Sequence, residues 1–308
     1  MKIAILQYAP QHLDLDASLS KAKQLISEAA KIKVDLAVFG EGWFSGYPAW
    51  LDHCTNIAFW NDPPMKKVYA RMIENSLQRT SESMSELCAL ASEHEIGLVI
   101  GANEYEPSTA KGTLYNSVFI INEKGEIANH HRKLVPTFTE RLLHAHGDGQ
   151  GLHAAEIKGA KVTASICWEH WMPLTRQSLH DTGEEIHVAL WPKVHEMHQV
   201  ASRQYAFEAR CFVLAAGQIM HSDNFPPELE KKPEIQEEGR LVLNGGSCVI
   251  GPDGFYIKEP DFDREVMVTA DLELGRIKEE SLNLDVSGHY QRGDVFEFSV
   301  NRSRRGER

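Results

Sequence analysis

The sequence predicts an α/β protein with mixed sheets, and three observations support this class. Short apolar runs rich in Val, Ile and Ala alternate with longer segments whose apolar residues recur at helical spacing. Two of the apolar runs are separated only by the turn Glu123–Gly125, which indicates a hairpin and hence antiparallel neighbours in at least one sheet. No linker rich in Gly, Pro or Ser divides the 308 residues, so we expect one domain over residues 1–300 and a short basic tail over residues 301–308.

In the first half of the chain, strand-like runs and helical periodicities follow one another. Lys2–Tyr8 is a short apolar run of strand length, and Ala17–Lys31 carries its Leu, Ile and Ala residues on one helical face. Ser81–His94 shows the same helical spacing. Further strands are predicted at Val34–Phe39, Gly97–Ala102, Tyr115–Asn122 and Ile127–Arg132.

The second half repeats this alternation. Pro173–Leu179 is expected to form a helix, because Pro173 suits a first helical turn and Gly183 lies past the end. Val200–Arg210 is another helical segment. Met220–Gly239, with its prolines and acidic residues, is expected to be an exposed excursion. Strands are predicted at Lys161–Cys167, His187–Trp191, Phe212–Ala216, Ser247–Gly251 and Val266–Asp271.

Composition and charge exclude several classes of function. The formal net charge is −12, and a chain this acidic is not expected to bind nucleic acid, which requires a local excess of Lys and Arg. The N-terminus lacks the apolar region and cleavage site of a signal peptide. No apolar run approaches the roughly 20 residues that span a bilayer. We therefore expect a cytoplasmic protein that does not associate with membranes.

The spacing of cysteine and histidine residues does not indicate a disulfide framework or a metal site. None of the five cysteines belongs to a C-x-x-C pair. The histidine pairs at 130–131, 144–146 and 195–198 do not form an H-E-x-x-H motif, and adjacent histidines on a strand point to opposite faces. We expect no bound metal and no organic cofactor.

Reactive side chains lie just after three of the predicted strands. Glu41 follows a strand in DLAVFGEGWFSGYP, Lys133 follows a strand in HHRKLVPTFTER with Glu140 beyond it, and Cys167 ends the strand in SICWEHWMPL. Each residue alone has an ordinary interpretation, as a turn residue, a surface charge or a core cysteine. Their combination at strand ends, where α/β folds collect ligand sites, indicates an active site.

The motifs around these residues resemble those of the nitrilase superfamily. FGEGWFSGYP, HRKLVPTFTER with HGDG, CWEHWMPL and GHYQRGDVF occur in the order and spacing of that family. The resemblance implies a Glu-Lys-Cys site at Glu41, Lys133 and Cys167, with Glu140 as a second glutamate of the same site. It also implies a four-layer α-β-β-α sandwich with two mixed sheets, paired into a homodimer or a higher homo-oligomer.

The chemistry of these residue types agrees with the resemblance. A nitrile carbon is a weak electrophile that needs a thiolate, whereas a free cysteine, with a pKa of about 8.5, is mostly protonated at neutral pH. Glu41 could take the thiol proton from Cys167 as a general base. Lys133 and the backbone N–H of Trp168 could stabilise charge that develops on nitrogen or oxygen. Glu140 could hold Lys133 in place or position the hydrolytic water.

The sequence therefore predicts a nitrilase that converts a small nitrile to a carboxylic acid and ammonia through thioimidate and thioester intermediates. Trp168 and Glu169 give the C-W-E form of the nitrilase branch, since amidase relatives more often carry C-Y-D. Gly40 and Gly293 stand where proline is common in the family, and neither change removes a reactive group. The alternative is an amidase, a carbamoyl hydrolase or a cyanide hydratase with the same site. An inactive binding module is disfavoured because all four reactive positions are present.

Aromatic and histidine side chains near the reactive positions are candidates for the substrate pocket. In the family the loops that carry them border the substrate, and apolar walls suit a small nitrile. Burial in the core or at a subunit contact is the alternative for each of them. The candidates for substrate binding are Trp43, Tyr47, Trp168, Trp191 and His195.

Overall fold

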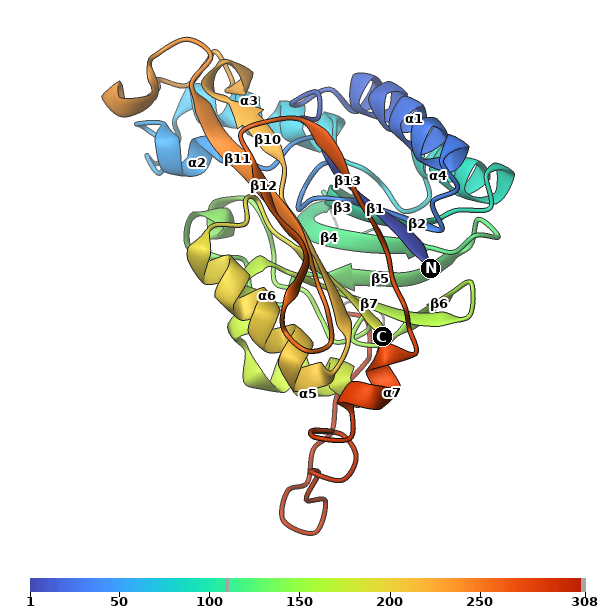
Figure 1. The fold of residues 1–308 in the computed structure, drawn as a ribbon. Helices are drawn as coiled ribbons and strands as arrows, with labels where there is room; N and C mark the ends of the chain where they lie inside the picture. Colours follow the sequence, from blue (N-terminus) through green and yellow to red (C-terminus); the bar gives the residue numbers. More distant parts are fainter. Residues whose placement is uncertain (109–110, 306–308) are drawn as a thin grey trace.

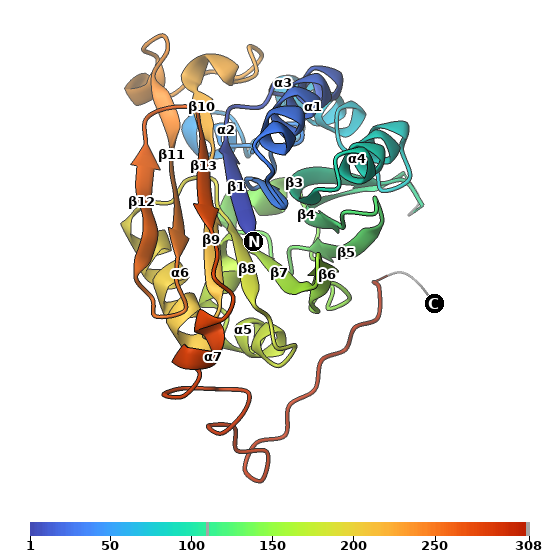
Figure 2. The same ribbon diagram turned by 45° about the vertical axis from the view of Figure 1, so that its right-hand side comes forward.

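The computed structural model describes residues 1–108 and 111–305, and its first sheet has six strands in the order β13-β1-β2-β3-β4-β5 (Figures 1 and 2). β1, β2 and β3 run parallel, whereas β4, β5 and β13 are antiparallel to their neighbours. The predicted hairpin is thus the pair β4–β5. The strands are β1 (Lys2–Gln7), β2 (Leu36–Phe39), β3 (Gly97–Glu106), β4 (Thr113–Ile121), β5 (Ile127–Arg132) and β13 (Val266–Asp271).

The second sheet has seven strands, in the order β10-β11-β9-β8-β7-β6 with β12 paired to β11. β7, β8 and β9 run parallel, and the remaining pairs are antiparallel. The strands are β6 (Ala155–Ile157), β7 (Ala160–Ile166), β8 (Ile186–Leu190), β9 (Phe212–Ala216), β10 (Ile219–His221), β11 (Leu241–Ile250) and β12 (Tyr256–Phe262). The expectation of mixed sheets is therefore confirmed for both sheets.

The two sheets pack face to face, and helices cover their outer faces (Figure 2). Successive residues of β1 show this arrangement, because side chains alternate between the faces of a strand. Ile3 and Ile5 belong to the core that includes residues of both sheets, whereas Ala4 and Leu6 belong to the core beneath the helices. α1 (Leu15–Lys31) and α4 (Glu82–Glu93) cover the first sheet, and α5 (Pro173–His180) and α6 (Glu196–Ala209) cover the second. The four-layer α-β-β-α sandwich is confirmed.

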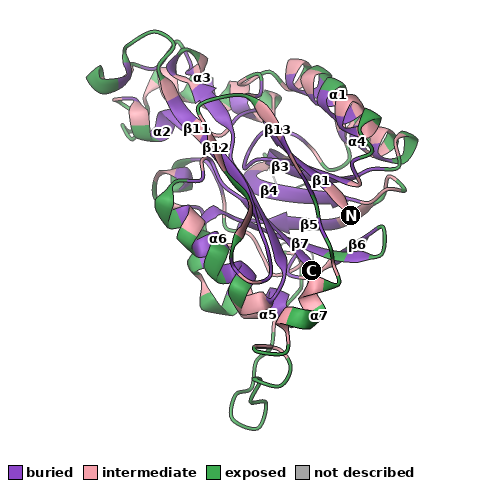
Figure 3. Cartoon of the chain, in the orientation of Figure 1, coloured by how far each residue is buried: buried purple, intermediate pink, exposed green. Residues whose placement is uncertain are grey.

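Local capping explains where the helices begin. The side chain of Asp14 accepts a hydrogen bond from the Ala17 N–H at 2.9 Å, and Ser81 accepts one from the Met84 N–H at 3.3 Å. Pro173 opens α5, where its missing N–H costs nothing. The strands are largely buried and the outward faces of the helices are exposed (Figure 3). The observed helices agree with the predicted ones to within a few residues. The largest difference is in α6, which begins four residues before the predicted start at Val200.

The prediction that Met220–Gly239 is an exposed excursion is wrong for its apolar residues. Phe225, Leu229 and Ile235 are buried in a third core cluster. This cluster also contains residues of α2 (Trp50–His53) and of α3 (Pro63–Glu74), a helix that was not predicted. The apolar residues of α3 recur at helical spacing, so the sequence did carry a signal for it: Met65, Val68, Tyr69, Met72 and Ile73. Residues 220–239 are held in place by contacts with α2 and α3, which are distant in sequence and cannot be predicted from amino-acid composition.

After α7 (Arg276–Glu280), residues 281–305 form a series of turns followed by an irregular segment. Figure 2 shows this segment turning back toward the side of the molecule where β5 and β6 lie. Arg304 pairs with Asp148 at 3.1 Å, and Arg302 donates to the Leu152 carbonyl at 3.0 Å. The described part of the basic tail is therefore anchored rather than free in solvent. Among residues 1–108 and 111–305, none of the helices has the length and apolar character needed to cross a membrane.

Candidate active site

Three strand ends bring the predicted catalytic side chains into one region. Glu41 follows β2, Lys133 follows β5 and Cys167 follows β7, and all three are buried. The Lys133 ammonium donates to Glu41 Oε1 at 2.9 Å. It also donates to both oxygens of Glu140, at 2.9 and 2.8 Å. The lysine therefore lies between two carboxylates in a single buried cluster.

Glu140 is fixed by its own short helix and by an aromatic hydroxyl. It lies in a 3₁₀ helix, Phe138–Leu142, and its Oε2 accepts a hydrogen bond from the Thr137 backbone N–H at 2.9 Å. The Tyr47 hydroxyl donates to Oε1 at 2.9 Å. With Lys133, these donors occupy both carboxylate oxygens. Glu140 is thus a fully partnered anion that holds the ammonium in position.

Glu41 is held differently, because one of its oxygens lacks a partner. The Asn116 side chain donates to Oε1 at 2.8 Å, and the Gln218 amide donates to the Glu41 backbone carbonyl at 2.5 Å. Oε2 is buried with no hydrogen-bond partner among the described atoms. That oxygen can accept a proton from a reacting group. Asn116 and Gln218 were not among the predicted site residues, although a polar residue inside the apolar run LYNSVFII was an available signal for Asn116.

Cys167 occupies a sharp turn between β7 and a 3₁₀ helix, Cys167–Trp171. Its φ is +54°, in the left-handed region that residues other than glycine seldom adopt, and such positions cluster at functional sites. Glu169 braces this turn by accepting from the backbone N–H groups of Ile166 and Leu134, both at 2.8 Å. The carboxylate of Glu169 therefore ties the cysteine turn to the loop that follows Lys133.

The environments of the two glutamates push their pKa values apart. Burial raises the pKa of Glu41 to about 7, and the charge of Glu140 adds to this effect, while Lys133 and Asn116 oppose it. Burial also acts to raise the pKa of Glu140, but the nearby Lys133 ammonium and the hydrogen bonds it receives lower it below its usual range. Such a separation assigns different roles to two carboxyl groups. Glu140 stays ionised at neutral pH, and Glu41 can gain and lose a proton there.

The thiol and the ammonium are coupled to the same carboxylates. Burial raises the pKa of Cys167 well above its usual value and the charge of Glu41 adds to this, although Lys133 and the Trp168 N–H lower it. Burial would lower the pKa of Lys133, but the charges of Cys167, Glu41 and Glu140 reverse that effect and raise it. The resting site therefore holds a charged lysine and a protonated thiol. The thiol must lose its proton to a base as the sulfur attacks.

Adjacent histidines on β5 point to opposite faces, as their strand position predicts. His130 Nε2 lies 2.8 Å from Glu104, whereas His131 Nε2 lies 2.9 Å from Glu169. Each ring thus binds a separate carboxylate. Among the described residues, no group of three or more His, Cys, Asp and Glu side chains is arranged to hold a metal ion.

Two of the substrate-binding candidates lie at the cluster or beside it. The Tyr47 hydroxyl contacts Glu140 directly. Trp168, next to the nucleophile, is 56% exposed and lines an apolar hollow on the outer side of the cysteine turn. The hollow is lined by Val135, Pro136, Thr137, Phe138, Arg141, Trp168, Trp171 and Met172. Its walls come from the loops that follow Lys133 and Cys167.

The other three candidates are packed among their own neighbours. Trp43 is fully buried against Phe39, in the core beneath α1 and α4, and its indole donates to a backbone carbonyl. Trp191 is fully buried and stacks on His198. His195 stacks on the other side of His198, directly before α6. These contacts place Trp43 and Trp191 in the core rather than on an open pocket wall.

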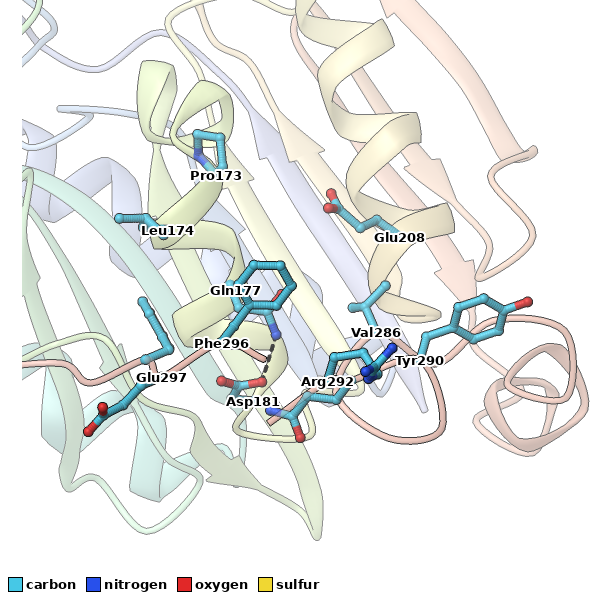
Figure 4. Close-up of a pocket in the computed structure, with 12 residues that line it drawn as sticks. Pro173, Leu174, Gln177, Asp181, Glu208, Val286, Tyr290, Arg292, Phe296 and Glu297 are labelled. Carbon is cyan, nitrogen blue, oxygen red and sulfur yellow. Dashed lines mark hydrogen bonds between the residues drawn. The ribbon is translucent and has the colours of Figure 1, made fainter. Parts of the chain in front are cut away.

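Another hollow lies between α5, α6 and the segment 286–298 (Figure 4). Figure 4 shows Gln177 and Asp181 of the α5 region joined by a hydrogen bond, which measures 2.7 Å. The lining residues are Pro173, Leu174, Gln177, Asp181, Glu208, Val286, Tyr290, Gln291, Arg292, Phe296, Glu297 and Phe298. None of the four reactive residues lines this hollow, which is therefore separate from the cluster.

Known proteins with sequences or structures similar to this chain share its class. The chain is 36% identical to "Nitrilase 2" from an unknown prokaryotic organism, an alignment that covers 98% of this chain and 93% of that protein. It is 34% identical to an arylacetonitrilase from Fusarium vanettenii, with 99% of this chain and 94% of that protein covered. The crystal structure of a carbon-nitrogen hydrolase from Helicobacter pylori G27 superposes with a TM-score of 0.71 at 20% identity, covering 96% of both chains.

The four-layer fold, with an ammonium, two carboxylates and a thiol at its strand ends, defines a class of hydrolases that cleave carbon–nitrogen bonds. A model of the carbon-nitrogen hydrolase family matches residues 2–280. The chain belongs to the carbon-nitrogen hydrolase family, and the protein is a hydrolase that acts on carbon–nitrogen bonds.

Proposed function

We propose that the protein is a nitrilase that hydrolyses an organic nitrile to a carboxylic acid and ammonia, with Cys167 as the nucleophile. The observation that carries the proposal is the cluster of Lys133 between two carboxylates of unequal pKa beside a buried thiol. The similarity over nearly the whole chain to proteins named nitrilase and arylacetonitrilase supports the same activity.

The first stage forms a bond between the cysteine sulfur and the nitrile carbon. Glu41, with a pKa near 7 and an unpartnered oxygen, takes the thiol proton as the Cys167 sulfur attacks. The same proton then passes from Glu41 to the nitrile nitrogen, which gives a thioimidate. Lys133 stabilises the negative charge that grows on this nitrogen, because its own charge is fixed by the two carboxylates.

The second stage uses two water molecules. The first water adds to the thioimidate carbon, the carbon–nitrogen bond breaks, and ammonia leaves a thioester on Cys167. A second water, deprotonated by Glu41, attacks the thioester and releases the carboxylic acid and the thiol. Glu140 remains ionised throughout and keeps Lys133 in place, which agrees with its lowered pKa. The apolar hollow beside Trp168 is lined by residues that follow Lys133 and Cys167 in the chain, and we propose that Tyr47 and Trp168 border the bound nitrile.

The test is a panel of aliphatic, arylaliphatic and aromatic nitriles, each assayed beside the matching amide. Ammonia and acid are measured together, and a covalent adduct is sought by mass spectrometry of the Cys167 peptide. We expect acid and ammonia in equal amounts from at least one nitrile. Rapid turnover of the amides with none of the nitriles would instead establish an amidase, and formamide from cyanide would establish a cyanide hydratase.

A matched pair of cysteine variants controls this assay. Cys167→Ala should abolish turnover and adduct formation, because no other group at the site can form the thioimidate. Cys88→Ala removes a cysteine of α4, remote in the fold from β7, and should leave turnover in place. Full activity in Cys167→Ala would show that the site is wrongly assigned.

We also infer that the enzyme works as a homo-oligomer in the cytoplasm. Leu174 of α5 and Val200 and Phe207 of α6 are 69%, 46% and 49% exposed on the outer helical layer, and exposed apolar side chains of this kind are typical of interfaces. The five cysteines are all free thiols. Light scattering of wild type beside Phe207→Glu would test the oligomer, because a charge in this layer should shift the mass toward the monomer.

A further inference from the structure

Beneath the cysteine turn, buried polar side chains form a chain of hydrogen bonds that the proposed reaction does not use. His170 Nδ1 lies 2.7 Å from the backbone carbonyl of Cys167. His170 Nε2 lies 3.0 Å from Nε2 of His187 on β8. His187 Nδ1 lies 2.8 Å from the hydroxyl of Thr163 on β7 and 3.2 Å from Glu184. All of these side chains are at most 5% exposed, so the chain runs through the protein interior.

The chemistry of the first contact fixes where the hydrogens lie. A backbone carbonyl can only accept, so His170 Nδ1 must carry a hydrogen and donate it to Cys167. Burial lowers the pKa of His170 to about 3, with a contribution from His187, so that the ring is neutral at working pH. Its Nε2 therefore has no hydrogen and must accept one from His187 Nε2. The Cys167 carbonyl thus fixes the tautomer of His170, and a neutral His187 matches it only with its hydrogen on Nε2, which leaves its Nδ1 as an acceptor beside the Thr163 hydroxyl.

Fixing the Cys167 carbonyl also fixes the next backbone N–H. The carbonyl of Cys167 and the N–H of Trp168 belong to one planar trans peptide and point in opposite directions. The N–H of Trp168 lowers the pKa of the Cys167 thiol, so it is directed toward the sulfur. A donor that holds the carbonyl on one side therefore keeps this N–H directed at the sulfur on the other. This restraint is useful because Cys167 adopts a left-handed backbone conformation, which neighbouring contacts must maintain.

We propose that His170 is a positioning residue for the nucleophile: its Nδ1–H orients the Cys167–Trp168 peptide so that the Trp168 N–H stays directed at the sulfur and at the charge that develops beside it. The inference rests on the proposed role of Cys167. His187 acts one step further away, by donating to Nε2 of His170 when Nδ1 carries the hydrogen. The effect on the reaction passes through the backbone, since neither ring contacts the substrate.

Neighbouring side chains fix the orientation of the His170 and His187 rings. The ring of His170 lies against Trp191, with centroids 4.7 Å apart, and the ring of His187 stacks on Tyr205 at 3.7 Å. Glu184 closes the far end of the chain by accepting from the Tyr205 hydroxyl at 2.8 Å and from His180 at 2.7 Å. A buried network in which each member has a partner is rigid, whereas one that loses a member leaves an unsatisfied group. The network is therefore able to hold one orientation of the peptide.

The first test compares three substitutions at position 170. His170→Asn keeps an amide N–H at about the reach of Nδ1, so it retains the donor to the Cys167 carbonyl. His170→Phe keeps an aromatic ring against Trp191 and removes the donor, and His170→Gln places its amide at the reach of Nε2 instead. We expect kcat to fall about 10- to 100-fold in His170→Phe and His170→Gln with KM within about threefold, as for a small misplacement of a catalytic group. His170→Asn should stay within about fivefold of wild type.

The second test substitutes position 187. A failure of the position 170 variants to fold would not affect these variants. His187→Gln keeps an N–H at the reach of Nε2 and can still donate to His170, whereas the shorter His187→Asn cannot. The first variant should retain most of the kcat and the second should lose about tenfold. His198→Phe serves as a packing control, because His198 stacks on Trp191 but bonds to the Lys193 carbonyl and not to the cysteine turn. Its kcat should remain within about threefold of wild type.

A direct readout of the nucleophile separates this inference from the proposed function. The rate of Cys167 alkylation by iodoacetamide, followed on the Cys167 peptide by mass spectrometry, should fall in parallel with kcat in His170→Phe and His187→Asn. Equal losses in the asparagine, glutamine and phenylalanine variants at position 170 would overturn the inference and show a packing role only. Wild-type kcat in His170→Phe would also overturn it, while an inactive Cys167→Ala would leave the proposed function intact.

Discussion

Two buried glutamates on neighbouring strands of one sheet differ in what surrounds them. Glu41 follows β2 and Glu104 lies on β3, and they are 0% and 1% exposed. The partners of each come from the same short stretches: Asn116 and Lys133 for Glu41, and the adjacent Ser117 and Arg132 for Glu104. Because adjacent residues of a strand face opposite sides, β4 and the end of β5 supply both clusters at once.

Equal burial leads to opposite pKa shifts in the two clusters. Burial acts to raise the pKa of Glu104, but hydrogen bonds and charges from His130 and Arg132 reverse this and hold it well below the usual range. Glu41 shares its one ammonium with Glu140, and its pKa is raised to about 7. A carboxylate with donors on both oxygens stabilises the fold, whereas one with an unpartnered oxygen is available as a base. Arg132 is also shared, between Glu104 and Glu106, so the donors that reach both oxygens, rather than burial or the number of cations, distinguish the two clusters.

The largest expected effect comes from making the same substitution at both glutamates. Glu41→Gln should lower kcat/KM about 10²- to 10⁴-fold, because it removes the general base. Glu104→Gln should leave kcat/KM within about fivefold of wild type, since Glu104 faces away from the reacting cluster. Steady-state kinetics on the best nitrile, with both variants at matched folded fraction, would measure the difference. Equal losses in both variants would mean that the two clusters act as one.

Stability should respond to the two substitutions in the opposite sense. Glu104→Gln leaves the buried Arg132 without its main partner and should cost about 3–5 kcal/mol, measured by urea unfolding at pH 7. The pKa of Glu104 is lowered in the native state, so its contribution is complete above the unfolded pKa of about 4.3 and is lost as pH falls below it. The difference between wild type and Glu104→Gln should therefore shrink in acid.

Glu41→Gln is expected to keep or increase the free energy of unfolding at pH 7. Its native pKa is raised, so the native state binds the extra proton between the unfolded pKa of about 4.3 and about 7, and stability falls as pH rises through that interval. Replacing the carboxyl with an amide removes this cost, while Lys133 keeps its pair with Glu140. A loss of several kcal/mol in Glu41→Gln would contradict the assignment of Glu41 as a base held at a cost in stability.

The positions of Glu41, Lys133 and Cys167 could be predicted from the sequence because each follows a predictable strand. Glu41, Lys133 and Cys167 could be placed together once the α/β alternation was recognised, since strand ends converge in such folds. The charge pattern that separates Glu41 from Glu104 could not be predicted. It depends on the register between β3, β4 and β5, which decides which side chains of adjacent strands meet.

Contacts between segments distant in sequence explain why other features of the site were not predicted. His170 follows the cysteine in CWEH, but its role depends on His187, which lies on the next strand of the sheet. Trp43 was expected near the substrate because it follows Glu41, yet the turn directs it into the core beneath α1 and α4. The ends of the strands therefore predicted where the candidate reactive groups lie, whereas proximity in sequence did not predict the residues that orient them.

A smaller effect is expected in the pH dependence of turnover, and only the Glu41 cluster should produce it. Since Glu41 must be ionised to accept the thiol proton, kcat/KM should fall about tenfold per pH unit below its pKa of about 7. Glu104 is ionised throughout the range from pH 5 to 9 because its pKa is lowered, so it adds no feature to the profile. Asn116→Leu removes a hydrogen bond that lowers the pKa of Glu41 and should move the acid limb to higher pH. A flat profile down to pH 5 would exclude Glu41 as the base.

The smallest expected effect compares one hydroxyl donor in each cluster. Tyr47 donates to Glu140 at 2.9 Å, and Ser117 donates to Glu104 at 2.5 Å. Removing a hydrogen bond of this kind changes a free energy by about 1 kcal/mol. In Tyr47→Phe that loss should appear in turnover, as a fall in kcat of about 3- to 10-fold, because the position of Glu140 sets the position of Lys133. In Ser117→Ala it should appear only in unfolding, with kcat near the wild-type value. If Tyr47→Phe instead lowers the urea midpoint and leaves kcat unchanged, Tyr47 stabilises the fold as Ser117 does. Its hydrogen bond to Glu140 would then have no part in turnover.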